Sequence, residues 1–135
     1  MNNMDFNLPG IVVTGASGFI GSNFLELACE KYRLFCLARR SRIEAKIPDH
    51  RNIRWTQVDI ADWEHLQEVA RCIKDHNGAD YMLHLAGYYD FTYKDNPEYQ
   101  RTNVEGTKNV LELARLLDIK QFLSLIHISE PTRPY

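Results

Sequence analysis

The chain has 135 residues and a formal net charge of −2 at pH 7, and 44% of its residues are hydrophobic while 25% are charged. These values are ordinary for one soluble globular domain, and the scattered lysines and arginines give no reason to expect nucleic acid or an anionic membrane as a partner. The first five residues lack the basic and apolar regions of a signal peptide, and no apolar run is long enough to span a bilayer. We therefore expect a cytoplasmic protein without a membrane segment.

The first element is an apolar run, Ile11-Val12-Val13, followed by the stretch Thr14-Gly15-Ala16-Ser17-Gly18-Phe19-Ile20-Gly21 and then by a segment of helical period. A strand that turns into a helix through glycines leaves unpaired backbone N–H groups at the positive end of the helix. Such a turn suits a phosphate, and the sequence predicts a cradle for a dinucleotide. A glycine-rich turn that binds nothing is the alternative.

Each of the three glycines has a predicted task. Gly15 permits the tight turn, Gly18 removes a side chain that would hold a pyrophosphate away, and Gly21 lets the helix lie close to the sheet. The spacing Gly-x-x-Gly-x-x-Gly resembles the short-chain dehydrogenase/reductase superfamily, and the whole motif resembles its extended branch, the NAD-dependent epimerase/dehydratase type. The cofactor contacts that we predict at this turn are Gly15, Ser17, Gly18, Phe19, Ile20 and Gly21.

The first helix is predicted over about 19–31, with its sheet-facing side formed by Ile20, Phe24, Leu27 and Ala28. The unbroken apolar run Leu34-Phe35-Cys36-Leu37 predicts a strand covered on both faces, as in a parallel sheet. Cys36, like Cys29 and Cys72, is expected to be a buried free thiol.

Two arginines, Arg39 and Arg40, follow the second strand, with Arg42 close behind. In a dinucleotide fold an acidic residue at this place binds the ribose hydroxyls, and this sequence has none. Guanidinium groups can pair with a 2′-phosphate, so we expect NADP in preference to NAD, with NAD kept as the alternative cofactor. The alternative interpretation is that these residues only form a basic turn exposed to solvent.

The third predicted strand, residues 53–58, ends at Asp59-Ile60. The resemblance implies that Asp59 lies near the adenine amino group and that Ile60 lies against the ring. The competing interpretation is that Asp59 only caps or turns the chain.

Asp62 is a suitable N-cap for the next helix, and Asn77-Gly78 is a suitable stop. The apolar face of this helix is predicted to be Leu66, Val69, Ala70 and Ile73. A fourth strand follows over 81–85. After it the family resemblance implies cofactor contacts at Leu85, Ala86 and Gly87, while His84 is expected to be a packed strand residue.

Beyond that strand lies an aromatic loop, residues 88–93, which could line a substrate pocket or cover the core. The dipeptide Asn96-Pro97 predicts the start of a long helix that continues through Leu117. Its apolar positions are Val104, Thr107, Leu111 and Ala114 on one face and Val110, Leu113 and Leu117 on the next. In the superfamily this helix often packs on a second subunit, so a homodimeric parent protein is an expectation, and Asn103 resembles the residue that supports the active site and cofactor.

No catalytic residue and no metal site are predicted. The superfamily transfers a hydride between nicotinamide and a carbonyl/alcohol substrate, with a Tyr-x-x-x-Lys pair for the proton, and no such pair occurs in this sequence. The three cysteines form no Cys-x-x-Cys pair, and the histidines lack the close spacing of metal ligands.

The resemblance covers about residues 9–122, and the tail that follows resembles the translation of a sequencing-library adapter. We therefore expect an incomplete NAD(P)-binding domain over 1–122 and a non-native tail over 123–135. An alternating stretch, residues 123–128, could still be drawn as a fifth strand.

Alternating strands and helices predict an α/β fold of Rossmann type, a truncated, doubly wound parallel sheet of order 3-2-1-4-5 with helices on both faces. The expected parent is an oxidoreductase, epimerase or dehydratase that binds a dinucleotide and a small-molecule substrate, and this chain alone is expected to be inactive. A thioester reductase domain is a further possibility within the enzyme class. The alternative class is a catalytically silent NAD(P)-binding sensor or scaffold.

Overall fold

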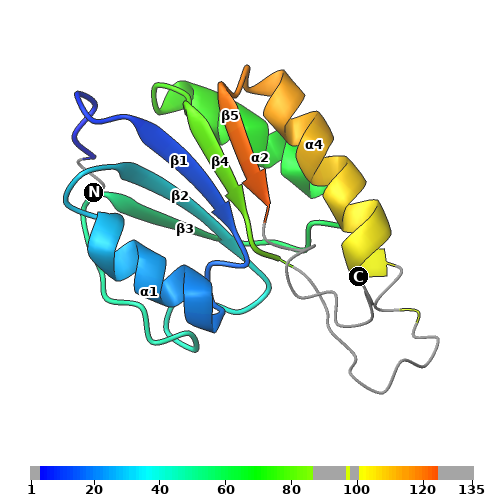
Figure 1. Cartoon of the computed structure of the whole chain (residues 1–135), viewed down its shortest axis with the longest axis horizontal. Helices are drawn as coiled ribbons and strands as arrows, with labels where there is room; N and C mark the ends of the chain where they lie inside the picture. Colours follow the sequence, from blue (N-terminus) through cyan, green and yellow to red (C-terminus); the bar gives the residue numbers. More distant parts are fainter. Residues whose placement is uncertain (1–3, 87–96, 98–100, 125–135) are drawn as a thin grey trace, which may run out of the picture.

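The computed structural model describes residues 4–86, 97 and 101–124, and it places five parallel strands in the order β3-β2-β1-β4-β5 (Figure 1). This confirms the predicted Rossmann-type fold. The strands are β1 (Gly10–Thr14), β2 (Arg33–Ala38), β3 (Ile53–Gln57), β4 (Tyr81–His84) and β5 (Gln121–Ser124). The helices are α1 (Phe19–Ala28), α2 (Trp63–Asp75), the π-helix η1 (Arg101–Gly106) and α4 (Thr107–Leu116).

Helices cover both faces of the sheet, with α1 on one face and α2 and α4 on the other (Figure 1). Successive residues of β1 point to opposite faces, so Val12 packs with α2 and α4 while Val13 packs with α1. All residues of β1 and β2 are buried, as expected for the centre of a parallel sheet. The apolar runs of these strands follow from this double cover.

Strand register brings the carboxyl ends of β1, β2 and β4 together at one edge of the sheet. Thr14 lies beside Leu37 of β2 and beside His84 of β4. The residues that follow these three positions must therefore meet at the same edge. This edge is where the order of the strands reverses and where nucleotides bind in folds of this kind.

The face of α1 that packs on the sheet agrees with the predicted one at Phe24 and Ala28 and differs from it at Ile20 and Leu27. Ile20 is 55% exposed and Leu27 is 81% exposed, whereas Gly21, Leu25 and Ala28 are buried. The helix turns Gly21 inward because this residue packs directly against the preceding turn, which moves Ile20 and Leu27 outward. The helix also ends at Ala28, with Cys29 as its C-cap, and so is shorter than predicted.

The prediction for α2 is confirmed in its boundaries and its buried face. The Asp62 side chain caps the helix by accepting a hydrogen bond from the His65 amide at 3.2 Å. Asn77 and Gly78 have left-handed φ values of 75° and 68° and stop the chain after the helix. The buried residues are Leu66, Val69, Ala70 and Ile73.

The last predicted helix is present from η1 onward and ends at Leu116, with Leu117 as its C-cap. Val110, Leu113 and Leu117 are buried as predicted, but two of the seven predicted apolar positions, Val104 and Leu111, are 47% and 51% exposed. Asn96 and the aromatic loop over 88–93 lie outside the described residues. Within the described part of the chain, no helix has both the length and the apolar character needed to cross a bilayer.

Candidate functional site

A cavity of about 310 Å³ opens at the edge of the sheet where the strand order reverses. It collects residues from the turn after β1, from the ends of β2 and β3, and from the segment after β4. Its lining residues are Gly15, Ser17, Gly18, Leu37, Ala38, Arg39, Arg40, Val58, Asp59, Ile60, Leu85 and Ala86. Most of the predicted cofactor residues are in this set, so the fold brings together segments that are far apart in the sequence.

Four of the predicted residues that the structure describes do not line the cavity. Phe19, Ile20 and Gly21 follow it in the first turn of α1, and Asn103 lies half-buried on η1. Gly87 lies outside the described residues. Three residues that line the cavity were not predicted from the sequence: Leu37, Ala38 and Val58. The one feature of the sequence that could have indicated them is their position just before the predicted polar contacts.

The turn after β1 is close-packed at two of its three motif glycines. Gly15 has a φ of +67°, and a Cβ built there would lie 2.6 Å from the Ala86 amide nitrogen. A Cβ at Gly21 would lie 2.5 Å from the Gly15 carbonyl oxygen. Gly21 therefore allows α1 to approach the turn itself, whereas the predicted approach was to the sheet.

The backbone amides at this turn are only partly available to an anion. The Gly18 amide donates to the Gly15 carbonyl at 3.1 Å and the Ala16 amide to the Leu37 carbonyl at 3.4 Å, so the prediction of unpaired amides is wrong at both positions. Gly18 is the N-cap of α1 and supplies no side-chain cap. Among the described residues, the amides of Phe19, Ile20 and Gly21 have no hydrogen-bond acceptor, which leaves three donors at the positive end of the helix.

The basic turn after β2 is held on both sides by polar contacts. The Arg40 guanidinium donates to the Ser17 carbonyl at 2.7 Å and so connects this turn with the glycine turn. Two side chains of β3 hold its backbone, because Trp55 Nε1 donates to the Arg40 carbonyl and Gln57 Nε2 to the Arg39 carbonyl, each at 2.9 Å. Both arginine side chains are exposed, but their backbone is anchored.

Asp59 at the end of β3 both turns the chain and lines the cavity. Its Oδ1 accepts a hydrogen bond from the Ala61 amide at 3.0 Å, and its Oδ2 forms an ion pair with Arg101 of η1. Burial raises the pKa of the Asp59 carboxyl, but the bonds from Ala61 and Arg101 and the charges of Arg101 and Arg39 outweigh burial and lower that pKa below its usual value. The carboxylate is therefore ionised at neutral pH and can accept hydrogen bonds from a ligand.

The segment after β4 is fixed by a buried polar group at the end of β1. The Thr14 hydroxyl oxygen accepts hydrogen bonds from the amides of Leu85 and Ala86, both at 3.1 Å. His84 is fully buried beside this hydroxyl, which confirms that it is a packed strand residue. This network sets the backbone that forms one wall of the cavity.

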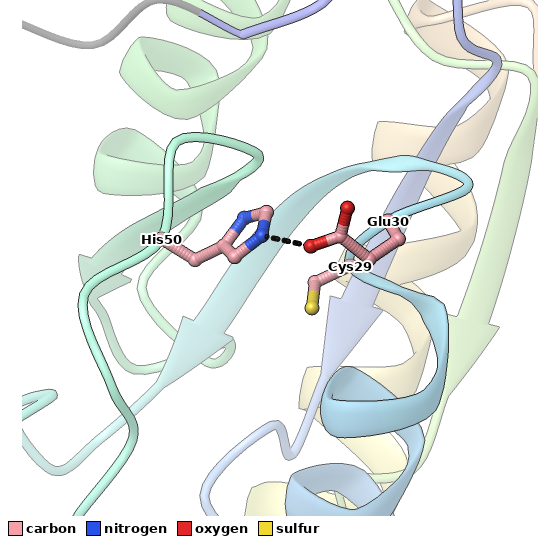
Figure 2. A group of neighbouring side chains, drawn as sticks. All are labelled: Cys29, Glu30 and His50. Atoms are coloured by element: carbon pink, nitrogen blue, oxygen red, sulfur yellow. Dashed lines mark hydrogen bonds and ion pairs between the residues drawn. The ribbon is translucent and has the colours of Figure 1, made fainter.

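A second cluster, made of Cys29, Glu30 and His50, carries groups that could ligate a metal (Figure 2). His50 Nδ1 accepts a hydrogen bond from the Asn52 amide at 3.0 Å, so the ring hydrogen lies on Nε2, which faces Glu30 Oε1 at 2.9 Å. Burial and the nearby carboxylates of Glu30 and Glu26 raise the pKa of the Cys29 thiol. In this arrangement the ring nitrogen that faces Glu30 carries a hydrogen and the thiol is protonated, so a metal would have to displace both hydrogens, and the contact is that of a hydrogen-bonded pair.

Comparisons with known proteins give one family match. A sequence model described as the NAD dependent epimerase/dehydratase family matches residues 11–129. A putative dihydroflavonol 4-reductase of Synechocystis is 30% identical over 113 residues, which is 81% of this chain and 30% of that protein. The chain spans about a third of the length of the curated relatives it matches.

Solved structures share the fold. UDP-glucose 4-epimerase from Thermotoga maritima, solved with UDP-glucose, has a TM-score of 0.69 and 26% identity over 85% of this chain and 37% of its own. The enzyme WbmH of Bordetella bronchiseptica, solved with NAD⁺, has a TM-score of 0.68 and 26% identity over 85% of this chain and 38% of its own.

Proposed function

The chain belongs to the NAD-dependent epimerase/dehydratase family, and we propose that it is the nucleotide-binding part of an NADP-dependent enzyme that acts by hydride transfer on a carbonyl or alcohol. One observation supports this most directly. The fold gathers the glycine turn, the two arginines after β2 and Asp59 after β3 around one cavity at the reversal of the sheet. The proposal assigns one part of a dinucleotide to each of these groups.

The diphosphate is assigned to the start of α1. The amides of Phe19, Ile20 and Gly21 have no hydrogen-bond acceptor among the described residues, and the N-cap Gly18 has no side chain in the way. A Cβ built at Gly18 would meet no atom closer than 3.4 Å, so this position is open to a ligand. These features fit an anionic group at this helix end.

The adenosine end is assigned to the ends of β2 and β3. Arg39 and Arg40 are exposed at the rim of the cavity, and the turn that carries them has no carboxylate to bind a free ribose 2′-hydroxyl. Guanidinium groups suit a 2′-phosphate because they are planar and permanently charged. Asp59 and Ile60 then lie at the purine, and Leu85 and Ala86 at the approach to the nicotinamide, which exchanges a hydride when it is bound.

Cofactor choice is tested by titrating the purified chain with NADPH and NADH and following nucleotide fluorescence. A phosphate paired with guanidinium makes charge-assisted hydrogen bonds, so we expect NADPH to bind about tenfold more tightly or better. The double variant Arg39→Ala with Arg40→Ala should bring the two affinities together. Equal binding by the wild type, or tighter binding of NADH, contradicts the role given to the arginines.

The chain itself is proposed to bind the cofactor without turning over a substrate. Its sequence has no Tyr-x-x-x-Lys pair, so the proton transfer that accompanies hydride transfer in the superfamily has no donor here. A longer sequence of the same gene that contains this pair supports the enzyme. A complete gene without it supports an NAD(P)-binding sensor or scaffold.

We propose further that residues 123–135 are not native. Their sequence resembles a translated library adapter, although β5 includes Leu123 and Ser124 and the family match extends to residue 129. Codons for this tail that differ from the adapter would reject the idea.

The parent protein is proposed to form a homodimer through α4. Val104 and Leu111, on η1 and α4, leave apolar side chains half exposed. Light scattering of the parent and of its Leu111→Glu variant is the test, because the variant should be monomeric if the prediction is right.

A further inference from the structure

The corner Asp59-Ile60 is held by residues that lie outside the cavity. The π-helix η1 and the start of α4 pack behind this corner, and three of their residues contact it: Arg101, Gly106 and Asn109. None of the three lines the cavity. The corner that we assign to the purine is therefore shaped by a segment more than forty residues further along the chain.

Gly106 allows the closest of these contacts. Its φ of −63° and ψ of −45° are ordinary helical values, so its backbone does not require glycine. A Cβ built there would, however, lie 2.6 Å from Ile60 Cδ1 and 2.7 Å from Ile60 Cγ1. The absence of a side chain at Gly106 is thus what lets Ile60 occupy its position at the cavity wall.

The other two contacts are polar. Asn109 Nδ2 donates to the Ile60 carbonyl at 2.9 Å, which anchors the backbone of the corner. The Arg101 guanidinium forms an ion pair with Asp59 Oδ2, while Asp59 Oδ1 accepts the hydrogen bond from the Ala61 amide. Both carboxylate oxygens are therefore held in place, and each keeps a lone pair for another donor.

We propose that Arg101 is a positioning residue that presents the Asp59 carboxylate to the exocyclic amine of adenine, while Gly106 and Asn109 set Ile60 at the wall of the same subsite. This inference rests on the proposed function of the cavity. A carboxylate held in this way accepts a hydrogen bond from an amine and repels a carbonyl oxygen. The subsite should therefore prefer adenine to hypoxanthine, which carries a carbonyl where adenine carries the amine.

The experiment compares two reduced nucleotides, NADPH and its hypoxanthine analogue, by fluorescence titration of the full chain. A hydrogen bond to a charged group contributes about 1.5–3 kcal/mol, so the wild type should prefer NADPH about tenfold or more. Asp59→Ala should abolish this preference. Arg101→Met should reduce it to about threefold or less, because the carboxylate loses the partner that orients it.

Arg115→Met is the matched control, since Arg115 pairs with Glu112 on the exposed side of α4 and lies outside the cavity lining. It should keep the wild-type preference. If Arg101→Met does not fold, Arg101→Lys retains the charge without the planar fork and should lose at least half of the preference.

The outcomes separate the two proposals. A full preference in Asp59→Ala contradicts the assignment of the cavity corner to the purine. If Asp59→Ala loses the preference for NADPH but Arg101→Met keeps it, only the role of Arg101 is overturned. Where Arg101→Lys replaces Arg101→Met, a preference kept by Arg101→Lys has the same meaning. Equal weakening of both nucleotides by Arg101→Met also overturns it, because a merely structural role would change affinity without changing the ratio.

Discussion

The Thr14 hydroxyl and the His84 ring form a buried hydrogen bond of 2.6 Å that joins the ends of β1 and β4. The Thr14 oxygen already accepts two amide hydrogens, so its own hydrogen is donated to His84 Nδ1. The ring hydrogen therefore lies on Nε2, which donates to the Thr107 hydroxyl at 3.1 Å. Hydrogen-bond accounting thus determines the tautomer of His84 and shows that α4 is tied to the edge of the sheet that carries the cavity.

Stability should fall in mild acid because of His84. Burial lowers the pKa of the His84 ring from 6.5 to about 4 in the folded chain. Between these two pH values the unfolded chain binds a proton at His84 and the folded chain does not. The free energy of unfolding therefore decreases as the pH falls from 6.5 to 4. Below pH 4 both states are protonated, and His84 causes no further change. The loss should be about 3 kcal/mol, measured by urea unfolding at pH 7.5 and pH 4.5. His84→Gln should remove most of this pH dependence, whereas His65→Gln should keep it.

Removing the Thr14 hydroxyl should lower the free energy of unfolding by more than the loss of one hydrogen bond would. Thr14→Val keeps the shape but leaves the Ala86 amide and the buried His84 ring nitrogen without their partner, whereas the Leu85 amide keeps the Thr14 carbonyl oxygen as an acceptor at 3.1 Å. We expect the free energy of unfolding to decrease by about 2–4 kcal/mol in urea titrations. Thr14→Ser retains the hydroxyl and should lose less than half of that amount. Similar losses in both variants would show that the methyl group contributes as much to stability as the hydrogen bonds of the hydroxyl.

Two glycines of the motif should respond to alanine in different ways. An alanine at position 15 would need a φ of +67°, and its Cβ would lie only 2.6 Å from the Ala86 amide nitrogen. Gly15→Ala should therefore destabilise the folded chain by about 2 kcal/mol or more. A Cβ at Gly18 meets no atom closer than 3.4 Å, so Gly18→Ala should keep the wild-type melting temperature. If the diphosphate lies at this turn, Gly18→Ala should nevertheless weaken NADPH binding about tenfold or more by steric exclusion. Unchanged binding in a folded Gly18→Ala protein would place the diphosphate elsewhere.

The indole of Trp55 should influence the preference for NADPH over NADH, although Trp55 is not among the residues that line the cavity. Its Nε1 donates to the Arg40 carbonyl at 2.9 Å, so Trp55→Phe removes one of the two side-chain hydrogen bonds that hold this turn while keeping an aromatic ring on β3. We expect NADPH affinity to fall by about threefold to tenfold, with a smaller change for NADH, since one hydrogen bond contributes about 1 kcal/mol. Equal changes for both nucleotides would assign Trp55 to stability alone. Fluorescence titration with each nucleotide measures the difference.

Much of the fold and of the candidate site could be predicted because the signals are local. The apolar runs of β1 and β2 indicate a sheet covered on both faces, and the alternation of strands and helices limits the sheet to a few parallel, doubly wound strand orders. Gly15, Arg39 and Asp59 could be assigned to one edge because each comes within two residues of the end of a strand, and parallel strands end on the same side. Their meeting around one cavity is a consequence of topology.

Only the tertiary structure decided which groups support that edge. The inward face of α1 depends on the contact of Gly21 with the turn, and sequence period alone placed Ile20 and Leu27 on the wrong side. The partners of residues at the cavity, such as Trp55 for Arg40 and Arg101 for Asp59, depend on strand register and on how η1 packs against the corner Asp59-Ile60. The hydrophobic period and the chemistry of turns depend on a few neighbouring residues. These hydrogen bonds, by contrast, join atoms that come within 3 Å of each other only after distant segments have packed. No local stretch of sequence therefore contains the physical information that determines them.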